Sequence, residues 1–150
     1  MKVVVGNIWT VKADYRIITT NGIVTKDGNA VMGRGVALQA KQKYPGIEKK
    51  LGILINVEGN RLHVLPHGLI SFPVKHHWKD KADLSLISES VLDLKCLASG
   101  MPGRIFAMPL PGTGNGRRTP EEIWPLLQDL PDNVLVIILD PLDPYLKIGK

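Results

Sequence analysis

The chain has few of the features that mark specialised protein classes. It contains one cysteine, Cys96, so no internal disulfide can form and a disulfide-stapled secreted fold is excluded. No apolar run is long enough to span a bilayer, and residues 1–6 turn polar too soon for a signal peptide. We therefore expect a cytoplasmic protein with no membrane partner. Cys96 has apolar neighbours in a predicted helix, and we expect it to fill the core.

Motifs with a fixed spacing for metals and nucleotides are also missing. No glycine-rich segment ends in Gly-Lys-Ser/Thr, which excludes a Walker A loop. Gly33-Arg34-Gly35 begins like a dinucleotide fingerprint, but Leu38 stands where the third glycine belongs. His63, His67 and the pair His76-His77 lack the cysteine or acidic cluster that would complete a zinc site. We therefore expect no metal and no cofactor.

The overall composition is typical of one globular domain. The 150 residues are 44% hydrophobic and 22% charged, without repeats, linkers or low-complexity segments, so we treat residues 1–150 as a single domain. The net charge of +5 is compatible with nucleic-acid contact. A solvated, lysine-rich surface is the simpler explanation, because Lys41, Lys43, Lys49 and Lys50 are spaced as on exposed helix faces.

Hydrophobic periodicity predicts an alternation of strands and helices. Strands are predicted over 3–5, 15–20, 53–57, 62–65, 69–72, 104–108 and 134–139. Helices are predicted over 35–44 and 46–51, from an Asp83 cap to just before Gly100, and from a Thr119-Pro120-Glu121-Glu122 capping box onward. The late alternation favours parallel pairing with helices on both faces of a sheet. In such folds the ligand lies at the carboxyl ends of the strands.

Two glycine-rich loops each follow a predicted strand and precede a helix. The first lies within Asn29 to Lys41, and the second is Pro111 to Gly116. Backbone N–H groups at a helix N-terminus have no intrahelical partner and can hold phosphate, and glycine lets the backbone approach it. Two such loops can bind a diphosphate from both sides. The alternative is a pair of tight turns that need glycine for backbone reasons alone.

Five segments in this order resemble the macrodomain family, whose members bind ADP-ribose and often process it. They are Gly6-Asn7-Ile8, Ala13-Asp14 with Ile17 to Asn21, Val31 to Lys41 with Tyr44-Pro45, Phe72 to Trp78, and Pro111 to Gly116. Asn7, and the stretch around Lys75, are most similar to the branch of DNA ADP-ribosyl glycohydrolase antitoxins. The resemblance implies an α/β fold, a three-layer α/β/α sandwich with a central mixed sheet.

The resemblance also implies a role for each site residue. Lys75 and Asn21 would be catalytic, with Asn21 at the distal ribose, and Asn7 and Ile8 would contact the adenine. The diphosphate and ribose would be bound by Met32, Gly33, Arg34, Gly35, Val36, Gly112, Thr113, Gly114, Asn115 and Gly116. From residue type alone, Asn7 and Asn21 are equally typical of turns, and Lys75 of an exposed loop.

The implied function is that of a hydrolase that binds ADP-ribose and cleaves an ADP-ribosyl linkage on DNA or protein. Lys75 would act near C1″, as a nucleophile after losing its proton or as a proton donor. The partners would be ADP-ribose or ADP-ribosylated DNA or protein. After Gly116 the branch usually continues Gly-Leu-Asp-Trp, whereas Arg117-Arg118 begins the segment here. That difference favours a non-catalytic ADP-ribose reader as the alternative; another is an ADP-ribose 1″-phosphate phosphatase.

Overall fold

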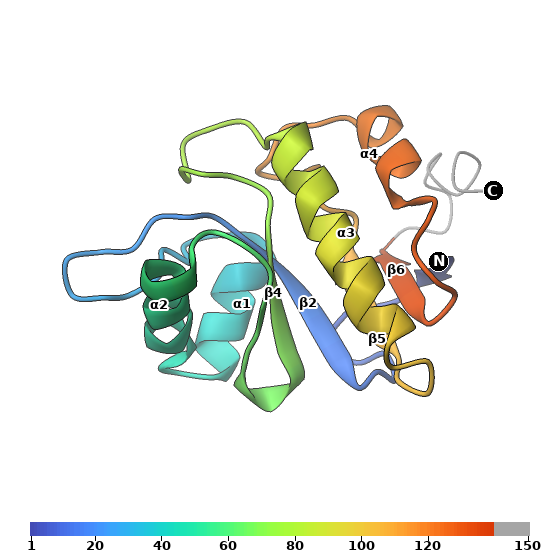
Figure 1. Ribbon diagram of the computed structural model, residues 1–150, viewed down its shortest axis with the longest axis horizontal. Helices are drawn as coiled ribbons and strands as arrows, with labels where there is room; N and C mark the ends of the chain where they lie inside the picture. The colour runs from blue at the N-terminus through green and yellow to red at the C-terminus, as the bar shows by residue number, and fades with distance from the viewer. Residues whose placement is uncertain (140–150) are drawn as a thin grey trace.

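Six strands form one mixed sheet at the centre of the computed structural model, which describes residues 1–139 (Figure 1). The strands are β1 (Lys2–Val5), β2 (Tyr15–Thr20), β3 (His63–Val64), β4 (Leu69–Pro73), β5 (Phe106–Pro109) and β6 (Val134–Ile138). Their order is β1-β6-β5-β2-β4-β3. Every neighbouring pair is parallel except β3 and β4, which are antiparallel. The predicted mixed sheet is confirmed.

Helices cover both faces of this sheet. They are α1 (Gly35–Lys43), α2 (Ile47–Glu58), α3 (Leu84–Ser99) and α4 (Pro120–Leu127), with a short 3-10 turn over Pro66–Gly68. Successive residues of a strand point to opposite faces. In β2, Ile17 belongs to the apolar cluster of α3 and α4, and Ile18 to that of α1 and α2. The three-layer α/β/α sandwich is therefore confirmed.

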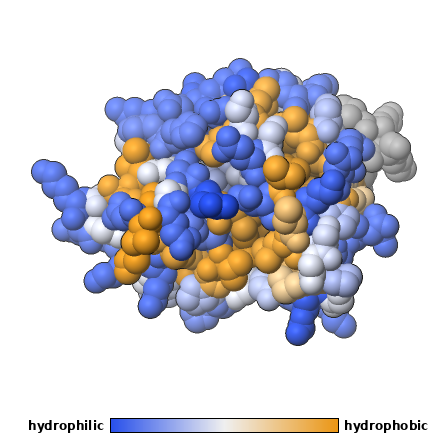
Figure 2. Space-filling view, in the orientation of Figure 1, coloured by the Kyte–Doolittle hydropathy of each residue, from blue (hydrophilic) through white to orange (hydrophobic). Residues whose placement is uncertain are grey.

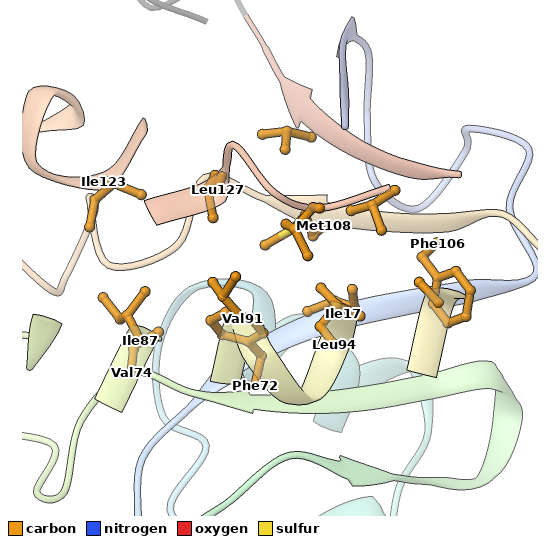
Figure 3. Close-up of a cluster of buried hydrophobic side chains, with 14 of the residues drawn as sticks. Ile17, Phe72, Val74, Ile87, Val91, Leu94, Phe106, Met108, Ile123 and Leu127 are labelled. Atoms are coloured by element: carbon orange, nitrogen blue, oxygen red, sulfur yellow. The ribbon is translucent and has the colours of Figure 1, made fainter. Parts of the chain in front are cut away.

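The larger cluster lies between α3, α4 and the sheet (Figure 3). In α3, Ile87, Val91 and Leu94 recur at helical spacing and turn one apolar face toward the sheet, where Phe72 and Met108 lie. All five are buried. Burial of such side chains stabilises the fold by about 1.5–3 kcal/mol each.

Two helix starts have the caps that the sequence predicts. Asp83 Oδ1 accepts hydrogen bonds from the N–H groups of Ser85 and Leu86, and α3 begins at the next residue after Asp83. Thr119 and Glu122 form a reciprocal capping box at α4. Each cap satisfies N–H groups that the first helical turn leaves without a partner.

The strand predicted over 53–57 is wrong, because these residues continue α2 to Glu58. The short run of mostly apolar, β-branched residues suggested a strand, but Ile53 and Val57 are 52% and 77% exposed. Instead, α2 is held by its other face. A Cβ at the buried Gly52 would lie 2.0 Å from the carbonyl oxygen of Gly28, so the loop before α1 packs directly on the helix backbone.

The expectation that Cys96 fills the core is also wrong, since its side chain is exposed. Leu94 and Ala98, two residues away on either side, are buried. At 100° per residue, a position midway between them lies on the outer face of α3.

Hydrophilic side chains predominate on the face seen in Figure 2. Figure 2 shows hydrophilic side chains around the outline of one face, with apolar side chains gathered nearer its middle. Lys41 and Lys43 on α1, and Lys49 and Lys50 on α2, are all exposed, as their spacing predicted. Within residues 1–139, no helix combines the length and the apolar character that a membrane crossing requires.

Candidate functional site

The sheet has a topological switch point between β2 and β5. These two strands are parallel neighbours, yet β2 is followed by α1 on one face and β5 by α4 on the other. Connections that leave toward opposite faces open a crevice at the carboxyl ends of the strands, where ligands bind in α/β folds. A cleft of about 1120 Å³ lies there, lined by both glycine-rich loops.

Most of the predicted site residues line this cleft. They are Asn21, Met32, Gly33, Arg34, Gly35, Val36, Lys75, Gly112, Thr113, Gly114, Asn115 and Gly116. Lining residues outside the predicted set include Trp78, Lys79, Leu110, Arg117 and the segment 137–139. The sequence could have indicated residues 137–139, because the carboxyl end of a parallel β6 lies at the same edge of the sheet as those of β2 and β5.

Asn7 and Ile8 are not among the residues that line the cleft. The Asn7 side chain forms a turn after β1: its Oδ1 accepts a hydrogen bond from the N–H of Trp9 at 2.8 Å. Its carbonyl oxygen accepts from the N–H groups of Thr10 and Val11. These bonds match the turn-forming alternative, and the adenine contact of Asn7 and Ile8 stays a prediction.

The N-terminus of α1 opens toward the cleft without a side-chain cap. Arg34 stands at the cap position in extended conformation and makes no capping bond, and no acidic residue lies in the first turn. By contrast, α3 and α4 have their caps. The backbone N–H groups of Gly35, Val36 and Ala37 therefore remain available, at the positive end of the helix dipole, for an anion in the cleft.

The cleft glycines fall into two kinds. A Cβ at Gly116 would lie 2.4 Å from the carbonyl oxygen of Gly112, and one at Gly112 would meet Ile87 at 2.9 Å, so the second loop needs both for its own closure. At Gly33 and Gly114 a Cβ would meet nothing within 4 Å, and neither residue has a left-handed φ. The fold gives no steric reason for glycine at these two positions, but a ligand lying against their backbone would.

Lys75 lies just beyond β4 and reaches across to the second glycine loop. Its Nζ donates to the carbonyl oxygen of Asn115 at 2.9 Å and to that of Trp78 at 3.2 Å. Partial burial lowers the pKa of Lys75 below its ordinary value, and the charges of Arg117 and Arg34 lower it further, while Asp80 opposes them. The position favours a lysine that loses its proton more easily than a surface lysine.

The charges around the cleft have one sign. Its lining residues include four cations, Arg34, Lys75, Lys79 and Arg117, and in the described part of the chain they include no carboxylate. Two or more cations within one cleft, beside a helix N-terminus, attract a polyanionic ligand.

Asn21 closes the base of the first loop with its side-chain amide. Its Nδ2 donates to the carbonyl oxygen of Val31 at 3.0 Å, and its Oδ1 accepts from the N–H of Ile23 at 3.0 Å. A primary amide has a second N–H and a second lone pair, so Asn21 can still contact a ligand while it holds the loop. Its predicted role at the ribose is compatible with this geometry and stays a prediction.

One wall of the cleft combines an aromatic ring with cations. Trp78 is 46% exposed, and Lys79 Nζ lies 5.2 Å from the centre of its ring. Arg117 holds a left-handed φ of 60°, and its Nη2 donates to the carbonyl oxygen of Lys79 at 3.1 Å. A non-glycine residue in this conformation costs about 1–2 kcal/mol. Strain of this kind gathers at functional sites.

No family model matches the chain. The DNA ADP-ribosyl glycohydrolase of Mycobacterium tuberculosis is 32% identical over 122 residues, which cover 71% of this chain and 34% of that protein. The chain spans about a third of the length of the curated relatives it matches. The macrodomain of Thermus aquaticus DarG aligns with a TM-score of 0.73 and 28% identity, covering 93% of this chain and 97% of that one. The macrodomain of Mycobacterium tuberculosis DarG aligns with a TM-score of 0.71 and 27% identity, covering 90% and 94%.

Proposed function

Since the chain belongs to the macrodomain family, in its DarG branch, we propose that its cleft binds ADP-ribose and hydrolyses an ADP-ribosyl linkage. The observation that carries the proposal is one cleft with two anion-binding loops, four cations and a partly buried lysine. The relatives named DNA ADP-ribosyl glycohydrolase support ADP-ribosylated DNA as the substrate.

The diphosphate would lie between the two glycine-rich loops. The uncapped N–H groups of α1 approach it from one side, and the backbone of the second loop from the other. Gly33 and Gly114 leave the space that its oxygens need. Gly35 and Asn115 come together where a Cβ on Gly35 would be 3.5 Å from Asn115 Nδ2, so the loops can enclose the ligand.

Lys75 would then act at C1″ of the distal ribose. A neutral amine has two N–H groups for the carbonyl oxygens of Asn115 and Trp78, and one lone pair left for C1″. As Nζ bonds to C1″, the bond from C1″ to the acceptor breaks, and the acceptor takes the proton that the positively charged nitrogen of the adduct releases. Water then hydrolyses the lysine adduct, so its hydroxyl ends on C1″ and Lys75 is restored. In the other possible role, a protonated Lys75 donates directly to the leaving acceptor.

The acceptor would leave along the wall that carries Trp78, Lys79 and Arg117. An exposed aromatic ring beside cations suits a nucleobase with its phosphates, because bases stack on such rings and phosphates pair with the cations. This arrangement favours DNA over a protein side chain as the modified acceptor.

The test uses a single-stranded oligonucleotide that carries one ADP-ribose, together with calorimetric titration of free ADP-ribose against AMP. We expect the protein to bind ADP-ribose much more tightly than AMP, and to release ADP-ribose from the oligonucleotide. Lys75→Ala should keep binding and lose release, whereas the matched variant Lys81→Ala, an exposed lysine of the same loop, should keep both. Equal turnover by Lys75→Ala would refute the catalytic role.

A non-catalytic reader is the second candidate. It is favoured by Arg117-Arg118, which stand where the branch usually has Gly-Leu before an aspartate, and by the lack of a carboxylate among the described cleft residues. Binding of ADP-ribose without release from any modified DNA or protein would support this candidate. Absence of binding would overturn both.

A further inference from the structure

We propose that Asn60, which does not line the cleft, is the positioning residue that holds Lys75 at the cleft wall. Asn60 lies in the turn between α2 and β3, and its Nδ2 donates to the backbone carbonyl oxygen of Lys75 at 2.9 Å. The inference rests on the proposed function, because it assigns how the lysine of that same site is oriented.

A second residue, Gly22, reaches the same backbone from the segment that follows β2. The N–H of Gly22 donates to the carbonyl oxygen of His76 at 3.2 Å, so two successive carbonyls, of Lys75 and His76, are each held by another segment. Gly22 also packs on the amide of Asn60. A Cβ there would lie 2.8 Å from both Cγ and Nδ2 of Asn60. We call Gly22, Asn60, Lys75 and His76 the Asn60 node.

The node lies where the sheet no longer supports the chain. β4 ends at Pro73, and the Val74 N–H is the next to donate to β2, through the carbonyl oxygen of Thr20. Beyond Val74 the chain turns into the loop that leads to α3. The direction of the Lys75 side chain toward Asn115 therefore depends on what fixes its own peptide group, and Asn60 supplies that contact.

Only Lys75 links the node to the diphosphate loops, through its hydrogen bond to the carbonyl oxygen of Asn115. Gly22, Asn60 and His76 do not line the cleft, and none of the three forms a hydrogen bond with residues 112–116 in the described part of the chain. Loss of Asn60 should therefore reduce the chemical step without weakening the hold on ADP-ribose. A merely structural role would instead lower stability and binding together.

Gly22 and Asn60 should act as one unit. Gly22→Ala puts a methyl group where the Asn60 amide lies, and so displaces that amide from Lys75. Gly22 has no left-handed φ, so alanine itself fits the backbone. When Asn60→Ala has already removed the amide, the two closest contacts of the new methyl group are gone, and the carbonyl oxygen of His76 at 3.0 Å remains.

The experiment compares Asn60→Ala, Gly22→Ala and the double variant with Asn56→Ala, a control on the exposed face of α2. From the loss of one partly buried hydrogen bond we expect kcat for ADP-ribose release to fall roughly tenfold in each single variant. The Kd for ADP-ribose should change less than about threefold in both. The double variant should be no slower than Asn60→Ala alone. Unchanged kcat in Asn60→Ala, or additive losses in the double variant, would overturn the inference.

Hydrogen exchange of the loop amides separates this inference from the proposed function. In Asn60→Ala, amides 76–83 should exchange faster than in the wild type, and in Asn56→Ala they should not. If the wild type releases no ADP-ribose, the proposed function fails. Hydrogen exchange in Asn60→Ala is then the remaining test of whether Asn60 holds the loop. Unchanged exchange over 76–83 then refutes the node, and faster exchange supports it.

Discussion

Gly33 gives a direct test of whether a ligand or the fold requires glycine in the first loop. A Cβ at this position meets no atom of the protein within 4 Å, and the residue has no left-handed φ. Gly33→Ala should therefore fold normally. Because alanine restricts the unfolded chain, the free energy of unfolding should stay the same or rise by about 0.4–1 kcal/mol.

The affinity for ADP-ribose, in contrast, should fall in Gly33→Ala. The added methyl group would project from the loop that carries the uncapped N-terminus of α1, and would hold the diphosphate away from at least one N–H group. A hydrogen bond to a charged group contributes about 1.5–3 kcal/mol. Loss of one such bond weakens ADP-ribose binding roughly 10- to 100-fold.

Gly103→Ala is the matched control. Gly103 lies in the turn between α3 and β5, away from the cleft, and its Cβ would also meet nothing within 4 Å, again without a left-handed φ. Calorimetric titration with ADP-ribose and urea unfolding should be measured on both variants. If Gly33→Ala binds ADP-ribose as tightly as Gly103→Ala does, the first loop is only a turn, and the anion-binding argument is wrong.

Two further predictions concern charge and capping. Arg117→Ala should raise the pKa of Lys75, because a positive neighbour is lost, and Asp80→Asn should lower it, because a negative one is lost. If Lys75 reacts as a neutral amine, the rate of ADP-ribose release rises with pH. Its midpoint then moves up in Arg117→Ala and down in Asp80→Asn, whereas a rate that falls with pH would identify Lys75 as the proton donor. Thr119→Ala should remove half of the capping box of α4 and lower the free energy of unfolding by about 1 kcal/mol in urea titration, and an unchanged value would contradict the capping role.

Features that depend on neighbouring residues were predictable from the sequence. The strand over 15–20 has the predicted limits, because its β-branched residues continue without interruption. The caps at Asp83 and Thr119 form as predicted, since a cap needs only N–H groups two or three residues ahead. The two glycine loops were recognisable for the same reason.

Features that depend on which face of a helix or strand is buried were harder to predict. Residues 53–57 have the apolar pattern of a strand, but tertiary packing of Leu51 and Gly52 keeps them in α2. Cys96 has apolar neighbours in the sequence, yet α3 turns Leu94 and Ala98 inward and leaves the cysteine outside. Pattern alone does not say which face another element will cover.

The resemblance of five short segments was enough to predict the family and the α/β/α layers, and the catalytic role of Lys75 stays a prediction. The surroundings of Lys75 come only from the tertiary structure. Its Nζ meets the carbonyl oxygen of a residue 40 positions later, and its own carbonyl meets Asn60, 15 positions earlier. These contacts arise because β2, β4 and β5 end side by side in one sheet and their helices leave toward opposite faces. Such proximity is set by long-range packing, which no local run of residues encodes.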